Sequence, residues 1–147
     1  MPQQGVVDPV AQGNFTELYA LLSALPTQDS GSYTGTLTGC TTAPTCTVSW
    51  VRTGKSVTIT IGANTGTSNA TSMTITGAMP AEIQPSTTQW MGVAQIEDAG
   101  SGTGNFGVGV TAGSSTISFS KGLTTLGFTA SGTKGISSNI SFTYQLT

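Results

Sequence analysis

Six carboxylates are the side chains of this 147-residue chain that could supply acid–base chemistry, because the sequence contains no histidine. A missing histidine removes the commonest general base and the commonest metal ligand, together with Ser-His and Cys-His nucleophile pairs. Only Glu97 and Asp98 are adjacent, and neighbouring side chains on a strand point to opposite faces of the sheet. A carboxylate pair must surround one substrate to act on it. We therefore expect no catalytic residues and no enzyme activity.

Two cysteines, Cys40 and Cys46, flank a short threonine-rich segment. Two thiols cannot complete a tetrahedral zinc site without further ligands, so we expect neither a metal nor a cofactor. The spacing permits a disulfide, which would close a small loop and stabilise the fold by about 2 kcal/mol. Free thiols are the expectation for a protein made without export. The sequence leaves both states open.

Aromatic side chains are the remaining candidates for a binding role. Trp50 lies in a segment of alternating polarity and is expected in the core, whereas Trp90 lies among polar residues. An aromatic ring in such a place can stack on a ligand or contact a protein partner. Trp90 is therefore a candidate ligand or partner contact, with a place in the core or at a subunit contact as the alternative.

A glycine-rich segment, residues 102–107, matches the dinucleotide-binding pattern GxGxxG. That site requires a helix directly after the glycines, whose N-terminal amides hold the pyrophosphate. The residues that follow, Val108 to Thr111, have the pattern of a strand instead. The glycines therefore indicate a turn and not a nucleotide site.

The composition limits the class of protein further. Charged residues make up 7% of the chain against about a quarter in an ordinary soluble domain. About 45 Ser and Thr residues provide the polar surface instead. The four Lys and Arg residues do not cluster, so a nucleic-acid partner is not expected. No apolar run is long enough for membrane insertion, and the N-terminus lacks the features of a signal peptide.

Strand signals occupy the chain from Tyr33 onward. Apolar residues alternate with Ser and Thr, and clusters of Gly, Asn and Ser separate the alternating segments. No helical segments lie between the strands, as a parallel sheet would require. The pattern predicts an all-β fold over residues 33–147, an antiparallel jelly-roll-like β-sandwich of about eight or nine strands.

The N-terminal 32 residues are predicted to form an attachment segment. Residues 1–12 are expected to be an extended arm, and residues 27–32 a flexible linker. Between them we expect a short helix that Asn14 caps and Pro26 ends. Its apolar stripe must be buried either on the chain's own sheet or against other copies or another protein, and the flexible flanks favour the second. The stripe consists of Phe15, Leu18, Tyr19, Leu22 and Leu25.

Three segments, residues 33–44, 66–80 and 128–136, resemble a β-rich module of tailed-bacteriophage virion proteins. Such modules occur in head fibres, capsid decoration proteins and short tail fibres. The resemblance implies a phage structural protein, usually a homotrimer, and covers about residues 33–147. It does not extend to the N-terminal segment.

These observations predict a non-enzymatic virion structural protein, made in the host cytoplasm and located on the virion surface. Residues 1–30 would anchor it to the capsid or to other virion proteins, and a trimeric β-sandwich would project outward. A head fibre or capsid decoration protein is favoured over a short tail fibre with a receptor-binding role. A carbohydrate-binding module that uses Trp90 on a host-surface glycan is the alternative from another class.

Overall fold

The structure is a computed structural model that describes residues 9–93, 95–101, 106–122 and 126–147. In this part of the chain, one α-helix precedes eleven strands and one short 3-10 helix. The helix is α1 (Pro9–Ala24), and the 3-10 helix is η1 (Ala81–Ile83). The strands are β1 (Gln28–Leu37), β2 (Thr45–Thr53), β3 (Ser56–Ile61), β4 (Asn64–Thr67), β5 (Met73–Gly77), β6 (Gln89–Val93), β7 (Ile96–Asp98), β8 (Phe106–Val110), β9 (Ile117–Lys121), β10 (Thr133–Ile136) and β11 (Ile140–Gln145).

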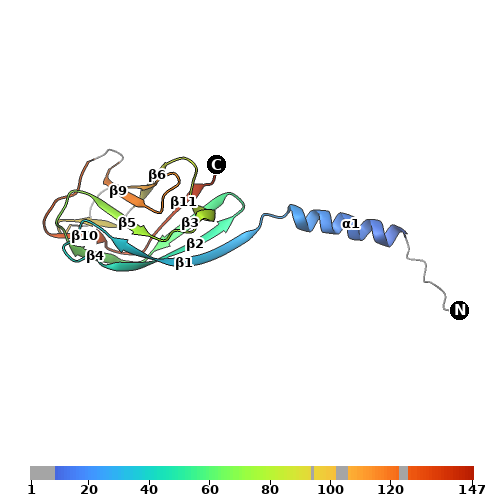
Figure 1. The fold of residues 1–147 in the computed structure, drawn as a ribbon, viewed down its shortest axis with the longest axis horizontal. Coiled ribbons are helices and arrows are strands. Elements are labelled where there is room, and N and C mark those ends of the chain that lie inside the picture. Colours follow the sequence, from blue (N-terminus) through green and yellow to red (C-terminus); the bar gives the residue numbers. More distant parts are fainter. Residues whose placement is uncertain (1–8, 94, 102–105, 123–125) are drawn as a thin grey trace.

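The strands form two sheets that enclose one core (Figure 1). The larger sheet has eight strands in the order β11-β3-β2-β1-β5-β9-β8-β6, and the smaller has the order β4-β10-β7. Every pairing between these strands is antiparallel. The predicted all-β antiparallel class is therefore confirmed, with more strands than the eight or nine expected.

The large sheet curves until its two edge strands, β6 and β11, meet. The side-chain amide of Gln89 on β6 joins them: its Oε1 accepts from the Gln145 backbone N–H at 3.1 Å, and its Nε2 donates to the Gln145 carbonyl. Next to it, the Ser86 hydroxyl donates to the Thr147 carbonyl at 2.8 Å. The Gln89 amide thus replaces a backbone peptide group and nearly closes the sheet, which leaves less unpaired edge exposed.

Alternation along the strands decides which side chains enter the core. On β11 every second residue is buried, and the residues between them are exposed Ser, Thr and Gln. Trp50, expected in the core, is only 6% exposed. The largest fully buried apolar side chains that fill the interior are Leu37, Ile59, Ile61, Met73, Ile75, Ile83, Ile96, Ile117 and Ile136.

Helix α1 begins earlier than predicted, at Pro9 instead of after Asn14. Proline is favoured at the first helical position because its missing N–H would have had no partner there. Asn14 therefore lies inside the helix and cannot cap it, and residues 9–12 are helical where an extended arm was predicted. Leu25 follows the last helical residue. Residues 1–8 of the predicted arm lie outside the described residues.

The predicted linker over residues 27–32 is also wrong. Strand β1 begins at Gln28 and pairs with β2 along its length, starting with Gln28 opposite Thr53. The Thr27 carbonyl accepts from the Gly54 N–H at 3.0 Å, which fixes the chain beside the β2–β3 turn. Backbone pairing does not require apolar side chains, so residues 28–32 form a strand although their polar sequence carries no strand signal. The β domain consequently starts at residue 28 and not at residue 33.

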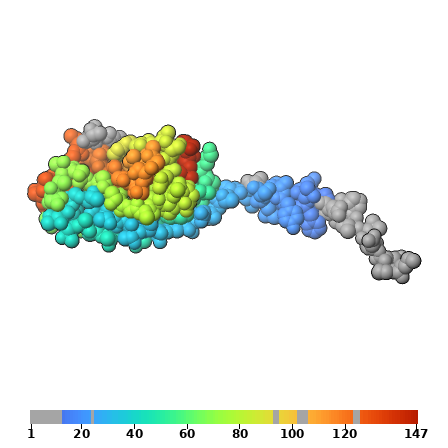
Figure 2. All heavy atoms as spheres, in the orientation of Figure 1, coloured from blue at the N-terminus to red at the C-terminus, as the bar shows by residue number. Residues whose placement is uncertain are grey.

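Helix α1 projects from one end of the β domain (Figures 1 and 2). The C-terminus lies at this same end, and β1 runs from the helix toward the opposite end, where β4 and β10 lie. The described side chains of α1 are all exposed, because no strand covers the helix. Within the described residues, no helix is both long enough and apolar enough to cross a membrane.

Candidate functional site

The first candidate site is the apolar surface of the helix and of the residue that follows it, which we call the helix apolar surface. All five residues of the predicted stripe lie on it, each between 50% and 71% exposed. Leu21, which the stripe did not include, is 68% exposed as well. The chain's own sheet therefore does not bury the stripe. A contiguous apolar surface of this kind marks a site of interaction.

The spacing on this surface indicates what it can pack against. Phe15, Leu18, Leu22 and Leu25 alternate steps of three and four residues, as the a and d positions of a coiled coil do. A helix of 16 residues is marginally stable alone in water. A parallel bundle of identical helices would bury this surface and stabilise α1.

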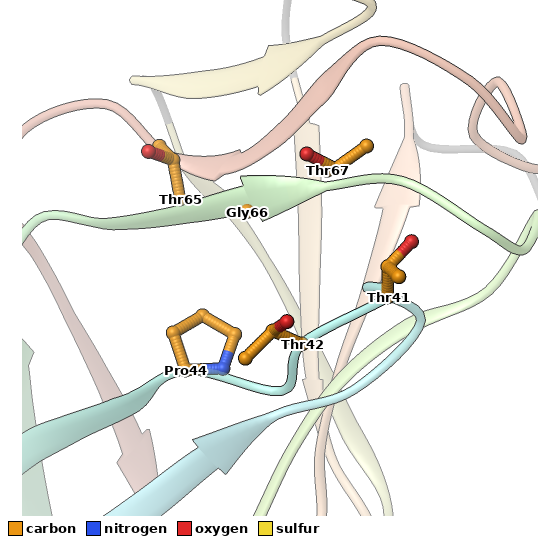
Figure 3. Close-up of a pocket in the computed structure, with 6 residues that line it drawn as sticks. All are labelled: Thr41, Thr42, Pro44, Thr65, Gly66 and Thr67. Carbon is orange, nitrogen blue, oxygen red and sulfur yellow. The ribbon is translucent and has the colours of Figure 1, made fainter.

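A second candidate site, the threonine pocket, lies at the end of the β domain far from the helix (Figures 1 and 3). It has a volume of about 420 Å³ and is open to solvent. The loop after β1 faces β4 across it, and the Thr41 N–H donates to the Thr67 carbonyl at 2.8 Å to hold the two together. The lining residues are Thr41, Thr42, Pro44, Thr65, Gly66 and Thr67. They offer hydroxyl groups and no ionisable side chain, so the pocket suits hydrogen bonding and not acid–base chemistry.

The third candidate site, the Trp90 groove, lies on the outer face of the large sheet. Trp90 on β6 is 55% exposed and therefore lies outside the core. The groove has a volume of about 300 Å³, and Leu126, 65% exposed, forms part of its wall. Its described lining residues are Thr71, Ser72, Trp90, Phe119, Ser120, Leu126 and Gly127. Sequence analysis found Trp90, whereas the other residues come from segments that only folding brings together.

The two cysteines are free thiols in the structure. Cys40 is buried, and its Sγ lies against Gly66 of β4, while the Cys46 Sγ lies against Gly35 of β1. The two sulfur atoms therefore pack against different strands. Burial raises the pKa of both thiols, which keeps them protonated and poorly nucleophilic.

Two ionisable side chains, Asp98 and Lys134, stabilise the β domain through internal hydrogen bonds. Asp98 accepts from the Thr129 N–H at 2.8 Å and the Thr129 hydroxyl at 3.0 Å, and pairs with the Lys121 ammonium at 2.7 Å. Burial raises the pKa of Asp98, but Lys121 and the two Thr129 bonds outweigh it and hold that pKa below its usual value. Lys134 is fully buried and donates to the Ala70 and Ser72 carbonyls, each at 2.7 Å. Burial lowers its pKa.

The adjacent carboxylates do not form a catalytic pair. Asp98 is buried on β7, and Glu97 lies on the opposite face of that strand and is half-buried. In the part of the chain that the structure describes, no three His, Cys, Asp or Glu side chains group together as metal ligands. The described end of the GxGxxG match, Phe106 and Gly107, belongs to strand β8, and residues 102–105 lie outside the described residues.

No protein-family model matches this chain, and no curated protein sequence matches it. Among solved structures, the chain is similar to the reovirus attachment protein sigma1 in complex with alpha-2,3-sialyllactose. The two are 14% identical with a TM-score of 0.49, and the similarity covers 81% of this chain and 66% of the sigma1 chain. This likeness establishes no family and carries no functional conclusion. The relation to tailed-phage virion proteins stays a prediction from the sequence.

Proposed function

We propose that this chain is a non-enzymatic structural protein of a tailed-bacteriophage virion, with a head fibre or capsid decoration protein favoured over a short tail fibre. The N-terminal segment attaches it to the particle, and the β domain is displayed outward on the virion surface. The partners are two further copies of the chain and a capsid or other virion protein.

The helix apolar surface is the observation that supports this proposal most. Its six large apolar side chains face solvent, at the end of a domain that otherwise buries its apolar residues well. Burying each leucine contributes about 1.5–3 kcal/mol, so association through α1 is strongly favoured. Three helices side by side would place three β domains at one end of the bundle, as a fibre or decoration protein requires.

The surface of the β domain supports the same role. Its exposed strand positions carry mainly Ser and Thr, and the chain has a net charge of −2. A nearly uncharged, hydroxyl-rich surface hydrates without strong dependence on ionic strength. That property suits a protein that stays exposed on a particle outside the cell.

The test changes the helix surface and measures mass by light scattering. Leu18→Asp combined with Leu22→Asp introduces two charges into the apolar surface, and we expect the trimer to become a monomer. Gly13→Asp combined with Ala20→Asp places the same charges on the opposite side of α1, where a Cβ on Gly13 meets nothing within 4 Å, and should leave the trimer intact. A wild-type protein that is monomeric at micromolar concentration contradicts the proposal.

Attachment to the particle is tested with the same variants. Phage particles assembled with wild-type protein, with either double variant or with a chain lacking residues 1–25 are purified and probed for the protein. This truncation leaves β1 complete, because β1 begins at Gln28. We expect only the wild type and the Gly13/Ala20 control on particles. Normal incorporation of the truncated chain would refute anchoring through the N-terminal segment.

A further inference from the structure

The outer face of the β domain carries an exposed indole ring with a rigid support beneath it. Trp90 on β6 pairs with Gly109 on β8. A Cβ atom built on Gly109 would lie only 2.9–3.0 Å from three atoms of the Trp90 ring system. The ring therefore lies flat against the backbone of β8, and a side chain at residue 109 would displace it.

The sequence of β8 is unusual in a way that this contact explains. Its residues alternate between large apolar side chains, Phe106, Val108 and Val110, which are buried, and glycines at 107 and 109. The outer face of the strand thus carries no side chain. Glycine weakens a strand interior and commonly marks a close approach of another group, which here is the Trp90 ring.

The free side of the ring opens onto the Trp90 groove. Three described large apolar side chains of the β domain are exposed, Val51, Trp90 and Leu126, and two of them line this groove. The Thr71 and Ser72 hydroxyls and the Trp90 indole N–H make no hydrogen bond to other described residues. None of the seven lining residues that the structure describes is charged. The described part of the groove therefore offers one rigid apolar plane, several polar groups without an internal hydrogen bond, and no charged side chain.

From this combination we infer that the Trp90 groove binds a neutral sugar, with the apolar face of one pyranose ring stacked on the exposed face of the Trp90 indole. The sugar hydroxyls would meet Thr71, Ser72 and the indole N–H at the edge of the ring. Support from β8 holds the indole in place before binding, which lowers the entropy cost.

A neutral sugar fits this groove better than a protein partner does. A stable protein interface buries at least about 1,000 Å², and two exposed apolar side chains cannot supply its core. The groove volume of about 300 Å³ lies at the small end of the range for small-molecule pockets. One or two rings of a longer glycan is the expected ligand. This inference concerns the β domain alone and holds whether or not α1 associates.

The test uses the full chain and methyl α- and β-glycosides of glucose, galactose, mannose and N-acetylglucosamine as probes. Saturation-transfer NMR reports which sugar protons contact the protein, and tryptophan fluorescence gives the affinity. We expect at least one glycoside to bind with a Kd of about 1 mM, and its ring C–H protons to receive the most saturation. No binding by any glycoside at about ten times that concentration overturns the inference.

Three variants separate stacking from other modes of binding. Trp90→Ala should weaken binding at least tenfold, and Gly109→Val should do the same by displacing the ring while Trp90 remains present. Val51→Ala removes an exposed apolar side chain elsewhere on the domain and should bind as the wild type does. Far-UV circular dichroism and the thermal midpoint establish that each variant is folded. Wild-type affinity in a folded Trp90→Ala protein overturns the inference, as does wild-type affinity in a folded Gly109→Val protein.

Discussion

At the scale of single residues, the scarce charges of this chain stabilise the β domain. Asp98 joins strand β7 to Thr129 and to Lys121 at the end of β9. Lys134 holds the segment around Ala70 and Ser72 through two carbonyls, and its ammonium lies 5.8 Å from the centre of the Phe128 ring. That segment supplies Thr71 and Ser72 to the Trp90 groove, so a buried cation positions part of the proposed sugar site.

The stability of the β domain should depend on acid through Asp98. Because the pKa of Asp98 is lower in the folded than in the unfolded state, its contribution is full above the unfolded pKa of about 4 and is lost as the pH falls further. Asp98→Asn should lower the free energy of unfolding at pH 7 by roughly 1–3 kcal/mol. It should also flatten the fall of that free energy in acid, measured by urea unfolding at several pH values.

Glu97→Gln provides the matched control for this experiment. Glu97 neighbours Asp98 but lies on the other face of β7, so its replacement should change neither the stability at pH 7 nor the acid dependence. If Asp98→Asn keeps the acid dependence of the wild type, Asp98 is not its source.

At the scale of elements, the closure of the large sheet depends on one side chain. Gln89 gives β6 two hydrogen bonds to the backbone of Gln145 on β11. Gln89→Ala should lower the free energy of unfolding by about 1–2 kcal/mol, because two hydrogen bonds are lost and their partners remain near the surface. Urea unfolding of the full chain measures the difference.

Gln145→Ala is the control for closure. The bonds from Gln89 go to the backbone of Gln145, and the Gln145 side chain donates one hydrogen bond of 3.3 Å to the hydroxyl of the half-buried Ser56. This variant should unfold within about 0.5 kcal/mol of the wild type. If Gln89→Ala and Gln145→Ala lower the free energy of unfolding equally, the loss comes from the smaller side chain and not from the hydrogen bonds of the Gln89 amide.

At the scale of the whole molecule, the helix and the β domain should respond separately to perturbation. The described side chains of α1 are exposed and are not packed against the strands. The stability of the β domain should therefore not depend on whether the helix is folded. Leu18→Asp with Leu22→Asp should therefore leave the thermal midpoint of the β domain within about 2 °C of the wild type, while the helical signal in circular dichroism falls. A fall of the midpoint well beyond 2 °C would reveal contacts between the helix and the β domain.

Much of the fold could be predicted from the sequence, because buried and exposed side chains alternate along any strand that has one face in the core and one in solvent. The segments now seen as β2, β3, β5, β9 and β11 carry apolar side chains at every second position, and the structure places those side chains inside. The glycines that separate the alternating segments are a second local signal: Gly54 lies in the β2–β3 turn, where it adopts a positive φ of 58° without strain.

Strands β4 and β10 could not be found this way, because their short sequences, NTGT and TKGI, contain glycine and no alternating apolar residues. Gly135 on β10 has a φ of 148°, and a Cβ there would lie 2.2 Å from the Asn64 carbonyl oxygen on β4. These short strands depend on close backbone pairing with neighbours distant in sequence. No local pattern of apolar residues records that pairing.

The sequence by itself determined the all-β class, the single apolar helix stripe and the small number of groups capable of chemistry. These features follow from residue types and from the spacing of apolar residues close together along the chain. Only the tertiary structure decided that the stripe stays in solvent, that β1 begins at Gln28 and that Trp90 lies across Gly109 beside Thr71 and Ser72. These features join residues that are far apart in sequence, so they exist only once the sheet has set its register and curvature.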